Sequence, residues 1–173
     1  MAVTAVADRA GGREDAVKLR KWFENVDLTK VKVNLKIVEM EWEPREPDRE
    51  AAWELYIELL TRIVTQPLPA EYGDEKTALD SAYALFPITR EILRRKGRDC
   101  VGFSRIAIAV LNQVVRPFTA KWHKLSLATA FDDEKQCTKF RIELQALQDD
   151  LRKYTRLLAD IAAVEDLTDM PSE

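Results

Sequence analysis

Hydrophobic residues recur along most of this 173-residue chain at intervals of three and four, the period of an amphipathic α-helix. The pattern predicts long helices from Pro47-Asp48 to about Thr65, from about Asp74 to Lys96, from about Val101 to Ala128, and from the acidic stretch FDDEKQ onward. The last helix carries an apolar seam at strict 4-3-4-3 spacing, formed by Phe140, Leu144, Leu147, Leu151, Tyr154, Leu158 and Ile161. Such a seam buries one helix face, either in the core or against a partner's helix.

The period changes near the N-terminus. Residues 14–26 predict a short amphipathic helix, whereas apolar and polar residues alternate over 31–37, as in a half-buried strand. The phase of this alternation slips at Val38, where a bulge or a strand end is expected. A single strand leaves its edges unpaired. It could pair with 38–43 as a hairpin, join a partner's sheet or pair across a dimer axis, and we expect one of the last two. The alternative is a lone extended arm packed on the helices.

The fold predicted from these patterns is mainly α. Short connections make successive helices antiparallel, which gives an up-down-up-down four-helix bundle over residues 46–166. A short helix and a β-strand form an N-terminal arm over 13–45. Residues 1–12 are predicted to be a flexible tail, and 167–173 a frayed one.

Two helices contain an internal proline, and one has a clear stop signal. Pro87 and Pro117 each lack an amide hydrogen, so each is expected to bend its helix. Gly97 follows the second helix directly, at a position suited to a C-terminal cap.

The formal net charge of −3 conceals strong segregation of charge along the chain. Residues 39–58 hold eight acids against two arginines, and residues 88–124 hold nine lysines or arginines against two acids. Two interpretations remain open. Acidic and basic helices pair within the fold, or a basic face stays available for an anionic ligand such as RNA or a phosphate.

Metal, cofactor and membrane chemistry have little support in the sequence. One histidine and two distant cysteines, Cys100 and Cys137, do not form a zinc cluster, and no Glu-x-x-His pair indicates a di-iron site. We therefore expect no metal and no cofactor. The longest apolar run, IAIAVL, is much shorter than the roughly 20 residues that a membrane span needs. A cytoplasmic protein without a membrane segment is expected.

The third predicted helix combines a strongly apolar first half with a polar stripe. Asn112, Arg116, Thr119 and His123 follow one another at intervals of four, three and four residues. A buried arginine requires a partner, because desolvation of an unpaired charge is costly. Counting along the helices puts Tyr83 at the level of Arg116, and Asp80 and Glu58 close to it. One hypothesis is therefore a structural salt bridge from Arg116 to Asp80 or Glu58.

The same stripe resembles the HEPN ribonuclease motif, in which an arginine and a histidine are separated by four to six residues and usually face their copies across a dimer. The resemblance covers eight residues, from Arg116 to His123. It implies that Arg116 stabilises the scissile phosphate and that His123 acts as a general acid or base, with Asn112 and Thr119 in support. HEPN proteins usually place a polar residue directly after the arginine, where this chain has Pro117.

A second resemblance covers more of the chain. The segments AAWELYIELLTRI, LFPITREILRR and LNQVVRPFTAKWH are similar to an uncharacterised bacterial family of small helical proteins. The resemblance implies a bacterial, single-domain protein, for which a role in antiphage defence is one context. It implies no mechanism.

Further basic residues are candidates for ligand binding. Arg90 and Arg94 lie one turn apart near the end of the second helix, and Lys121 and Trp122 lie beside the polar stripe. Cations also stabilise any helix C-terminus, so a solvated basic end is the alternative interpretation of the arginines.

Two functions follow from these observations. The first is a non-catalytic interaction or ligand-binding module that works with a partner protein. It is expected to form a homo-oligomer through the arm at 29–43 or through the seam of the fourth helix. The second is a metal-independent, HEPN-like ribonuclease that uses Arg116 and His123 on RNA.

Overall fold

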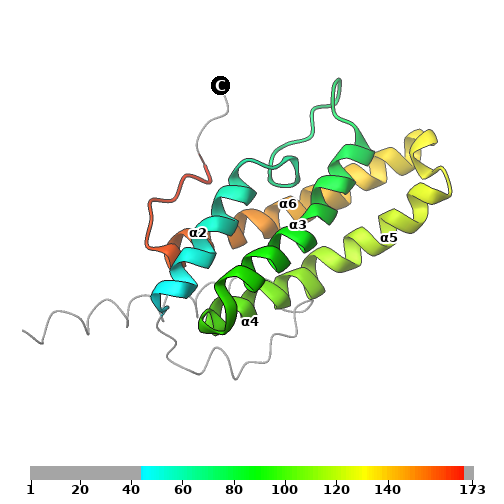
Figure 1. Cartoon of the computed structure of the whole chain (residues 1–173). Coiled ribbons are helices and arrows are strands. Elements are labelled where there is room, and N and C mark those ends of the chain that lie inside the picture. Colours follow the sequence, from blue (N-terminus) through cyan, green and yellow to red (C-terminus); the bar gives the residue numbers. More distant parts are fainter. Residues whose placement is uncertain (1–43, 170–173) are drawn as a thin grey trace, which may run out of the picture.

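The structure is a computed structural model, and it describes residues 44–169 (Figure 1). Within that range the chain is helical and has no β-strand. The α-helices are α2 (Glu46–Leu60), α3 (Glu75–Lys96), α4 (Val101–Val110), α5 (Arg116–Leu127) and α6 (Glu134–Ala162). The mainly α class predicted from the sequence is confirmed. The predicted tail, short helix and strand over residues 1–43 lie outside the described residues.

The helices lie alongside one another, and short turns join them except for α2 and α3, between which residues 61–74 form a longer connection (Figure 1). A 3₁₀ turn, η2 (Ile63–Thr65), follows α2, and similar turns at Gly97–Asp99 and Ala130–Asp132 precede α4 and α6. The most extensive packing is between α2 and α6, while α3 packs on α2 and α5. Within the described residues, no helix is both long enough and apolar enough to cross a bilayer.

The buried carboxylate of Asp48 connects the N-terminal ends of α2 and α4 through hydrogen bonds. Asp48 is 0% exposed, and its side chain accepts hydrogen bonds from the amide of Phe103 at 2.9 Å and from the amide of Arg45 at 3.2 Å. Arg45 also donates to the carbonyl of Asp99 at 2.6 Å. Amides in the first turn of a helix have no partner within that helix, so Asp48 satisfies α4 from a different part of the chain.

The boundaries of α3 follow signals in the sequence. Asp74 accepts a hydrogen bond from the amide of Thr77 at 2.6 Å, which caps the helix start. The helix ends at Gly97, which has a φ of 70° and therefore suits glycine. Pro87 lies inside α3 on an exposed position, and the helix continues through it.

Pro117 has a visible effect on the backbone that precedes it. The predicted third helix consists of α4, a π-helical segment η4 (Leu111–Val115) and α5, without a break. In η4 the amide of Arg116 donates to the carbonyl of Leu111, five residues earlier. Proline has no amide hydrogen and its ring crowds the carbonyl four residues before it, so a wider turn accommodates the proline where a break would otherwise occur.

The apolar seam of α6 lies in the core of a single chain. All of its members, Phe140, Leu144, Leu147, Leu151, Tyr154, Leu158 and Ile161, are buried. The interpretation of the seam as core is therefore confirmed, and this face is occupied by the chain's own helices.

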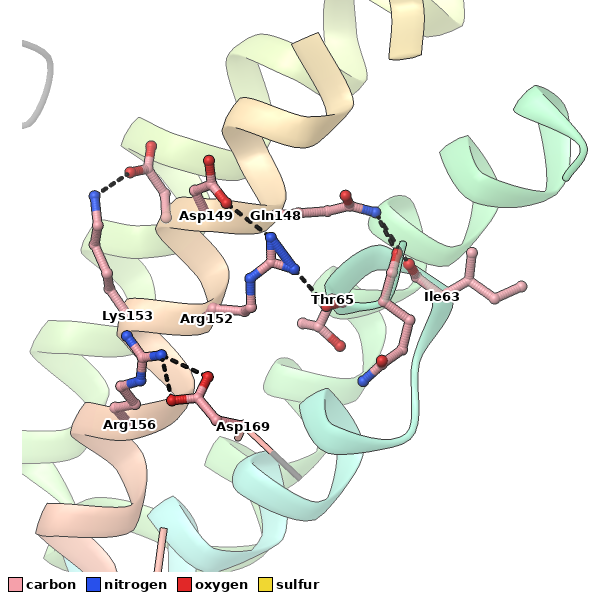
Figure 2. Close-up of polar contacts among 10 residues, drawn as sticks. Ile63, Thr65, Gln148, Asp149, Arg152, Lys153, Arg156 and Asp169 are labelled. Atoms are coloured by element: carbon pink, nitrogen blue, oxygen red, sulfur yellow. Dashed lines mark hydrogen bonds and ion pairs between the residues drawn. The ribbon is translucent and has the colours of Figure 1, made fainter. Parts of the chain in front are cut away.

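Polar contacts tie the connection after α2 and the C-terminal residues to α6 (Figure 2). The Gln148 amide donates to the carbonyl of Gln66 at 2.5 Å, and Arg152 donates to the carbonyl of Thr65 at 3.4 Å. Arg156 pairs with Asp169 at 2.7 Å.

The hydroxyl of Tyr56 holds the same C-terminal residues. It accepts a hydrogen bond from the Leu167 amide at 2.7 Å and donates to the carbonyl of Glu165 at 3.1 Å. Residues 167–169 thus make contacts that the prediction of a frayed tail did not include, and residues 170–173 lie outside the described range.

Candidate functional site

The polar stripe predicted on the third helix divides into exposed and buried members. Asn112, Arg116 and His123 are exposed, whereas Thr119 is 4% exposed. The Thr119 hydroxyl donates to the backbone carbonyls of Val115 at 3.1 Å and Arg116 at 3.2 Å. Thr119 therefore satisfies its own helix and has no role at the surface.

Arg116 is held in place by its own helix and by α3. Its Nε donates to Oδ1 of Asn112 at 3.0 Å, and its Cζ lies 4.9 Å from the centre of the Phe86 ring. The Phe86 ring lies 5.9 Å from that of Tyr83, which is 58% exposed. The guanidinium thus lies over the Phe86 ring, and no carboxylate among residues 44–169 pairs with its charge.

The predicted salt bridge from Arg116 to Asp80 or Glu58 is wrong. Asp80 pairs with Lys76 on the same helix at 2.5 Å, and Glu58 pairs with Arg62 at 2.6 Å. Both acids have a base four residues away, and such a pair forms without any tertiary constraint. Because Arg116 is exposed, it also has no desolvation cost that would require a carboxylate.

His123 lies on the same side of α5 as Arg116. Seven residues correspond to nearly two helical turns, so the two side chains start about 10 Å apart along the axis. The His123 imidazole is exposed and makes no hydrogen bond or ion pair with any described residue. Only its backbone carbonyl is used, as an acceptor for the Ser126 hydroxyl at 2.8 Å.

Lys121 and Trp122, predicted to bind a ligand, are engaged by one glutamate of α6. The Lys121 ammonium lies 2.5 Å from a carboxylate oxygen of Glu143, and the Trp122 indole donates to the same carboxylate at 2.9 Å. Burial raises the pKa of Glu143, but the hydrogen bonds from Lys121 and Trp122 outweigh it and the pKa is lowered overall. These residues join α5 to α6, with Trp122 fully buried.

Much of the basic charge near the end of α3 is neutralised by α2. Arg95 pairs with Glu54, and Lys96 pairs with Glu50 at 2.7 Å and Glu54 at 3.1 Å. The interpretation that acidic and basic helices pair within the fold is confirmed for these residues.

Two other arginines of α3 are not paired with acidic residues of α2. Arg90 and Arg94 are exposed on α3 and form no ion pair or hydrogen bond with any described residue. Because α3 packs against α5, and Phe86 against Arg116, we consider these arginines together with the exposed residues Tyr83, Arg116 and His123 of the same two helices. We call this set of five residues the α3–α5 surface.

The sequence did not identify either aromatic residue near Arg116, Phe86 or Tyr83, as a candidate site residue. Phe86 has the period of a core residue, and nothing in its spacing distinguishes a ring that supports an arginine. Tyr83 was placed at the level of Arg116, but the residue in contact is Phe86, three positions later. Counting residues gives the height along a helix and misses the direction in which a side chain points.

The described part of the chain contains no cluster of metal-ligating side chains, and it contains two free cysteines. No group of three or more His, Cys, Asp or Glu side chains within residues 44–169 is arranged to hold a metal ion. Cys100 is buried and Cys137 is half-buried, and both are free thiols. Burial raises the pKa of the Cys137 thiol, which makes it a poor nucleophile.

The site is therefore a solvent-exposed surface of arginines and an aromatic ring, with one histidine. Comparison of the chain with models of known protein families, with curated proteins and with solved structures finds no match.

Proposed function

We propose that this protein is a non-catalytic interaction module that binds an acidic segment of a partner protein on the α3–α5 surface. The observation that carries the proposal is the contrast among its basic residues. Arg95 and Lys96 are paired with glutamates of α2, whereas Arg90 and Arg94 on the same helix have no acidic partner among the described residues.

The composition of the surface favours a protein partner. Arginine and tyrosine are enriched at protein interfaces, because they combine apolar contact area with hydrogen bonding. Tyr83 is 58% exposed beside Phe86, and Arg116 is held by Asn112 and Phe86. An arginine that is already positioned loses less conformational entropy on binding.

The overall charge argues against a long nucleic acid as the main partner. Non-specific binding to a polyanion relies on many cationic contacts and on long-range attraction. The net charge of the chain is −3, so attraction is limited to the local surface. An acidic segment of a protein needs only that local complementarity.

The proposal also covers the arrangement of the helices, the oligomeric state and the cellular setting. We propose an up-down-up-down arrangement of the helices, and a homodimer formed through residues 29–43, because the seam of α6 is already buried within one chain. A bacterial cytoplasm, with antiphage defence as one context, is part of the same proposal. It rests on the resemblance of three segments to a bacterial family.

Binding of a defined peptide tests the proposal. The probe is a short fluorescein-labelled peptide in which glutamates alternate with leucine and phenylalanine, and its counterpart replaces each glutamate with lysine. We expect the full-length protein to raise the fluorescence anisotropy of the acidic peptide only, with an affinity that falls as salt is added. Equal binding of both peptides, or binding of neither, contradicts the proposal.

A second candidate is the HEPN-like ribonuclease, which is favoured by one observation. Arg116 and His123 are both exposed on one side of α5, as a phosphate-binding residue and a general acid or base would need to be. Incubation with total cellular RNA in EDTA tests it, with wild-type protein and the His123→Ala variant in parallel. Cleavage by the wild type alone establishes this candidate, and no cleavage by either protein excludes it for this substrate.

A further inference from the structure

The connection between α2 and α3 contains a tight turn that projects an aromatic side chain into solvent. In this turn, formed by residues 69–73, the amide of Gly73 donates to the carbonyl of Pro69 at 2.9 Å. A methyl group on Gly73 would collide with the same carbonyl oxygen, so this close approach requires glycine. Tyr72, next to this glycine, is 88% exposed. We call residues 69–73 the Tyr72 turn.

Arg141 of α6 holds both sides of the Tyr72 turn. Its guanidinium donates to the carbonyls of Pro69 at 3.1 Å and Gly73 at 2.8 Å, and it pairs with Glu75 at 2.6 Å. The base of the turn is therefore fixed, while Tyr72 stays open to solvent. An aromatic side chain presented in this way loses less conformational entropy on binding than one on a free loop. Tyrosine is also enriched among the residues that dominate binding at protein interfaces.

The Tyr72 turn and the start of α3 are acidic. Glu71 and Asp74 are exposed and form no ion pair with any described residue. Residues 63–75 hold three acids and no base, and the next base along the chain, Lys76, pairs with Asp80. The turn thus combines an exposed aromatic ring with free carboxylates, which is the composition that the proposed function expects of a partner segment.

The α3–α5 surface has the complementary composition. Arg90 and Arg94 have no acidic partner among residues 44–169, and Arg116 lies over the Phe86 ring without a carboxylate from the same range. Guanidinium groups bind carboxylates and stack on aromatic rings. These arginines therefore suit both kinds of group that the Tyr72 turn offers.

Within one chain the Tyr72 turn cannot reach Arg90. The turn lies before α3, whereas Arg90 lies 15 residues after Glu75 on that helix, about 22 Å along its axis. The connection that contains the turn and the arginine-bearing end of α3 are thus separated along the helix (Figure 1). Because Arg141 holds the turn in place, a contact between the turn and the arginines of α3 has to join two copies.

From the composition and the separation of these two surfaces, we propose that the Tyr72 turn of one copy binds the α3–α5 surface of another, with Glu71 and Asp74 facing the arginines. The inference rests on the proposed function and names the partner of that surface as a second copy of this chain. The two sides of the contact differ, so it joins copies head to tail, into a ring or an open chain. It does not involve residues 29–43.

Mixing two full-length variants, each with one side of the contact disabled, tests this inference. The surface variant is Arg90→Glu/Arg116→Glu, and the turn variant is Glu71→Lys/Tyr72→Ser. All four positions are exposed, so both variants should fold, which circular dichroism verifies. The surface variant carries fluorescein at its N-terminus. Its anisotropy should rise when the turn variant is added, because this mixture restores one complete contact.

The affinity in the mixture should be at least tenfold higher than that of either variant for itself, and it should fall as salt is added. Any association through residues 29–43 contributes equally to all three mixtures and cancels in the comparison. Adding Glu71→Lys/Tyr72→Ser to the labelled surface variant should weaken its binding to the turn variant at least tenfold. The matched control adds Leu127→Ser/Asp132→Lys, which removes an apolar residue that is 76% exposed and an exposed acid near the start of α6. It should leave the affinity unchanged.

Two results would overturn the inference and leave the proposed function intact, provided that the wild type binds the acidic peptide. One is a mixture that binds no more tightly than either variant binds itself, which would show that the partner is a different protein. The other is an equal loss of affinity with the Leu127→Ser/Asp132→Lys control. If the acidic peptide is not bound either, the proposed function fails together with this inference.

Discussion

Replacing Asp48 with alanine should destabilise the protein more than any surface substitution. The Asp48 carboxylate is fully buried and accepts hydrogen bonds from the amides of Phe103 and Arg45, so it joins the start of α2 to the start of α4. A buried amide that loses its acceptor costs about 1–3 kcal/mol, and loss of a helix cap costs about 1 kcal/mol. We expect the free energy of unfolding to fall by about 3 kcal/mol in Asp48→Ala.

Urea unfolding followed by circular dichroism measures this change. For a protein of this size, a loss of about 3 kcal/mol corresponds to a decrease in Tm of about 6–12 °C. Asp48→Asn keeps one acceptor oxygen and should lose about 1 kcal/mol. Asp80→Ala is the control, since its exposed pair with Lys76 contributes less than about 0.5 kcal/mol. If Asp48→Ala unfolds like Asp80→Ala, the proposed role of this carboxylate in capping α4 is incorrect.

Three further predictions concern single positions. Arg141 binds the Glu75 carboxylate of α3 and three backbone carbonyls in the connection between α2 and α3. Arg141→Ala should therefore lower the free energy of unfolding in urea by about 2–3 kcal/mol, and Arg141→Lys should recover part of that loss. Gly97 has a φ of 70°, and a methyl group added there would meet open space, so Gly97→Ala should lower stability by about 1 kcal/mol through backbone strain alone. The lowered pKa of Glu143 means that its contribution to stability is complete above its ordinary pKa of 4.5 and is lost as the pH falls through the lowered value. In Glu143→Gln the free energy of unfolding should fall less steeply between about pH 4.5 and lower pH. An unchanged pH dependence would contradict this role of Glu143.

The helices could be predicted from the sequence because their signals are local. Gly97 and the acidic residues before α3 and α6 mark boundaries that the structure reproduces, with Asp74 and Asp133 as the N-terminal caps. The seam of α6 is long and regular enough to identify a core face without any knowledge of what covers it.

Contacts between distant parts of the chain could not be predicted in the same way. Asp48 and Arg141 act on residues 55 and 66 or more positions away, and nothing in their immediate sequence differs from that of a surface charge. The expected partner of Arg116 was wrong for a related reason. A level along a helix was counted correctly to within one turn, but Asp80 points to solvent and pairs with Lys76.

Pro117 is accommodated by a π-helical segment, which the sequence did not predict. The missing amide was expected to bend the helix, and the structure shows a π-helical segment over Leu111–Val115. Local widening keeps α4 and α5 continuous, and Asn112 still accepts a hydrogen bond from Arg116, four residues later.

The most direct test of the central claim compares binding of the acidic peptide by wild-type protein and by Arg90→Glu/Arg116→Glu. Both arginines are exposed and neither meets a carboxylate among residues 44–169, so this variant should fold with nearly unchanged stability. We predict a Kd at least tenfold weaker, about 1.4 kcal/mol of binding free energy, with no change for Lys135→Glu/Lys139→Glu. Equal affinity of the wild type and the Arg90→Glu/Arg116→Glu variant would show that the α3–α5 surface does not bind the peptide.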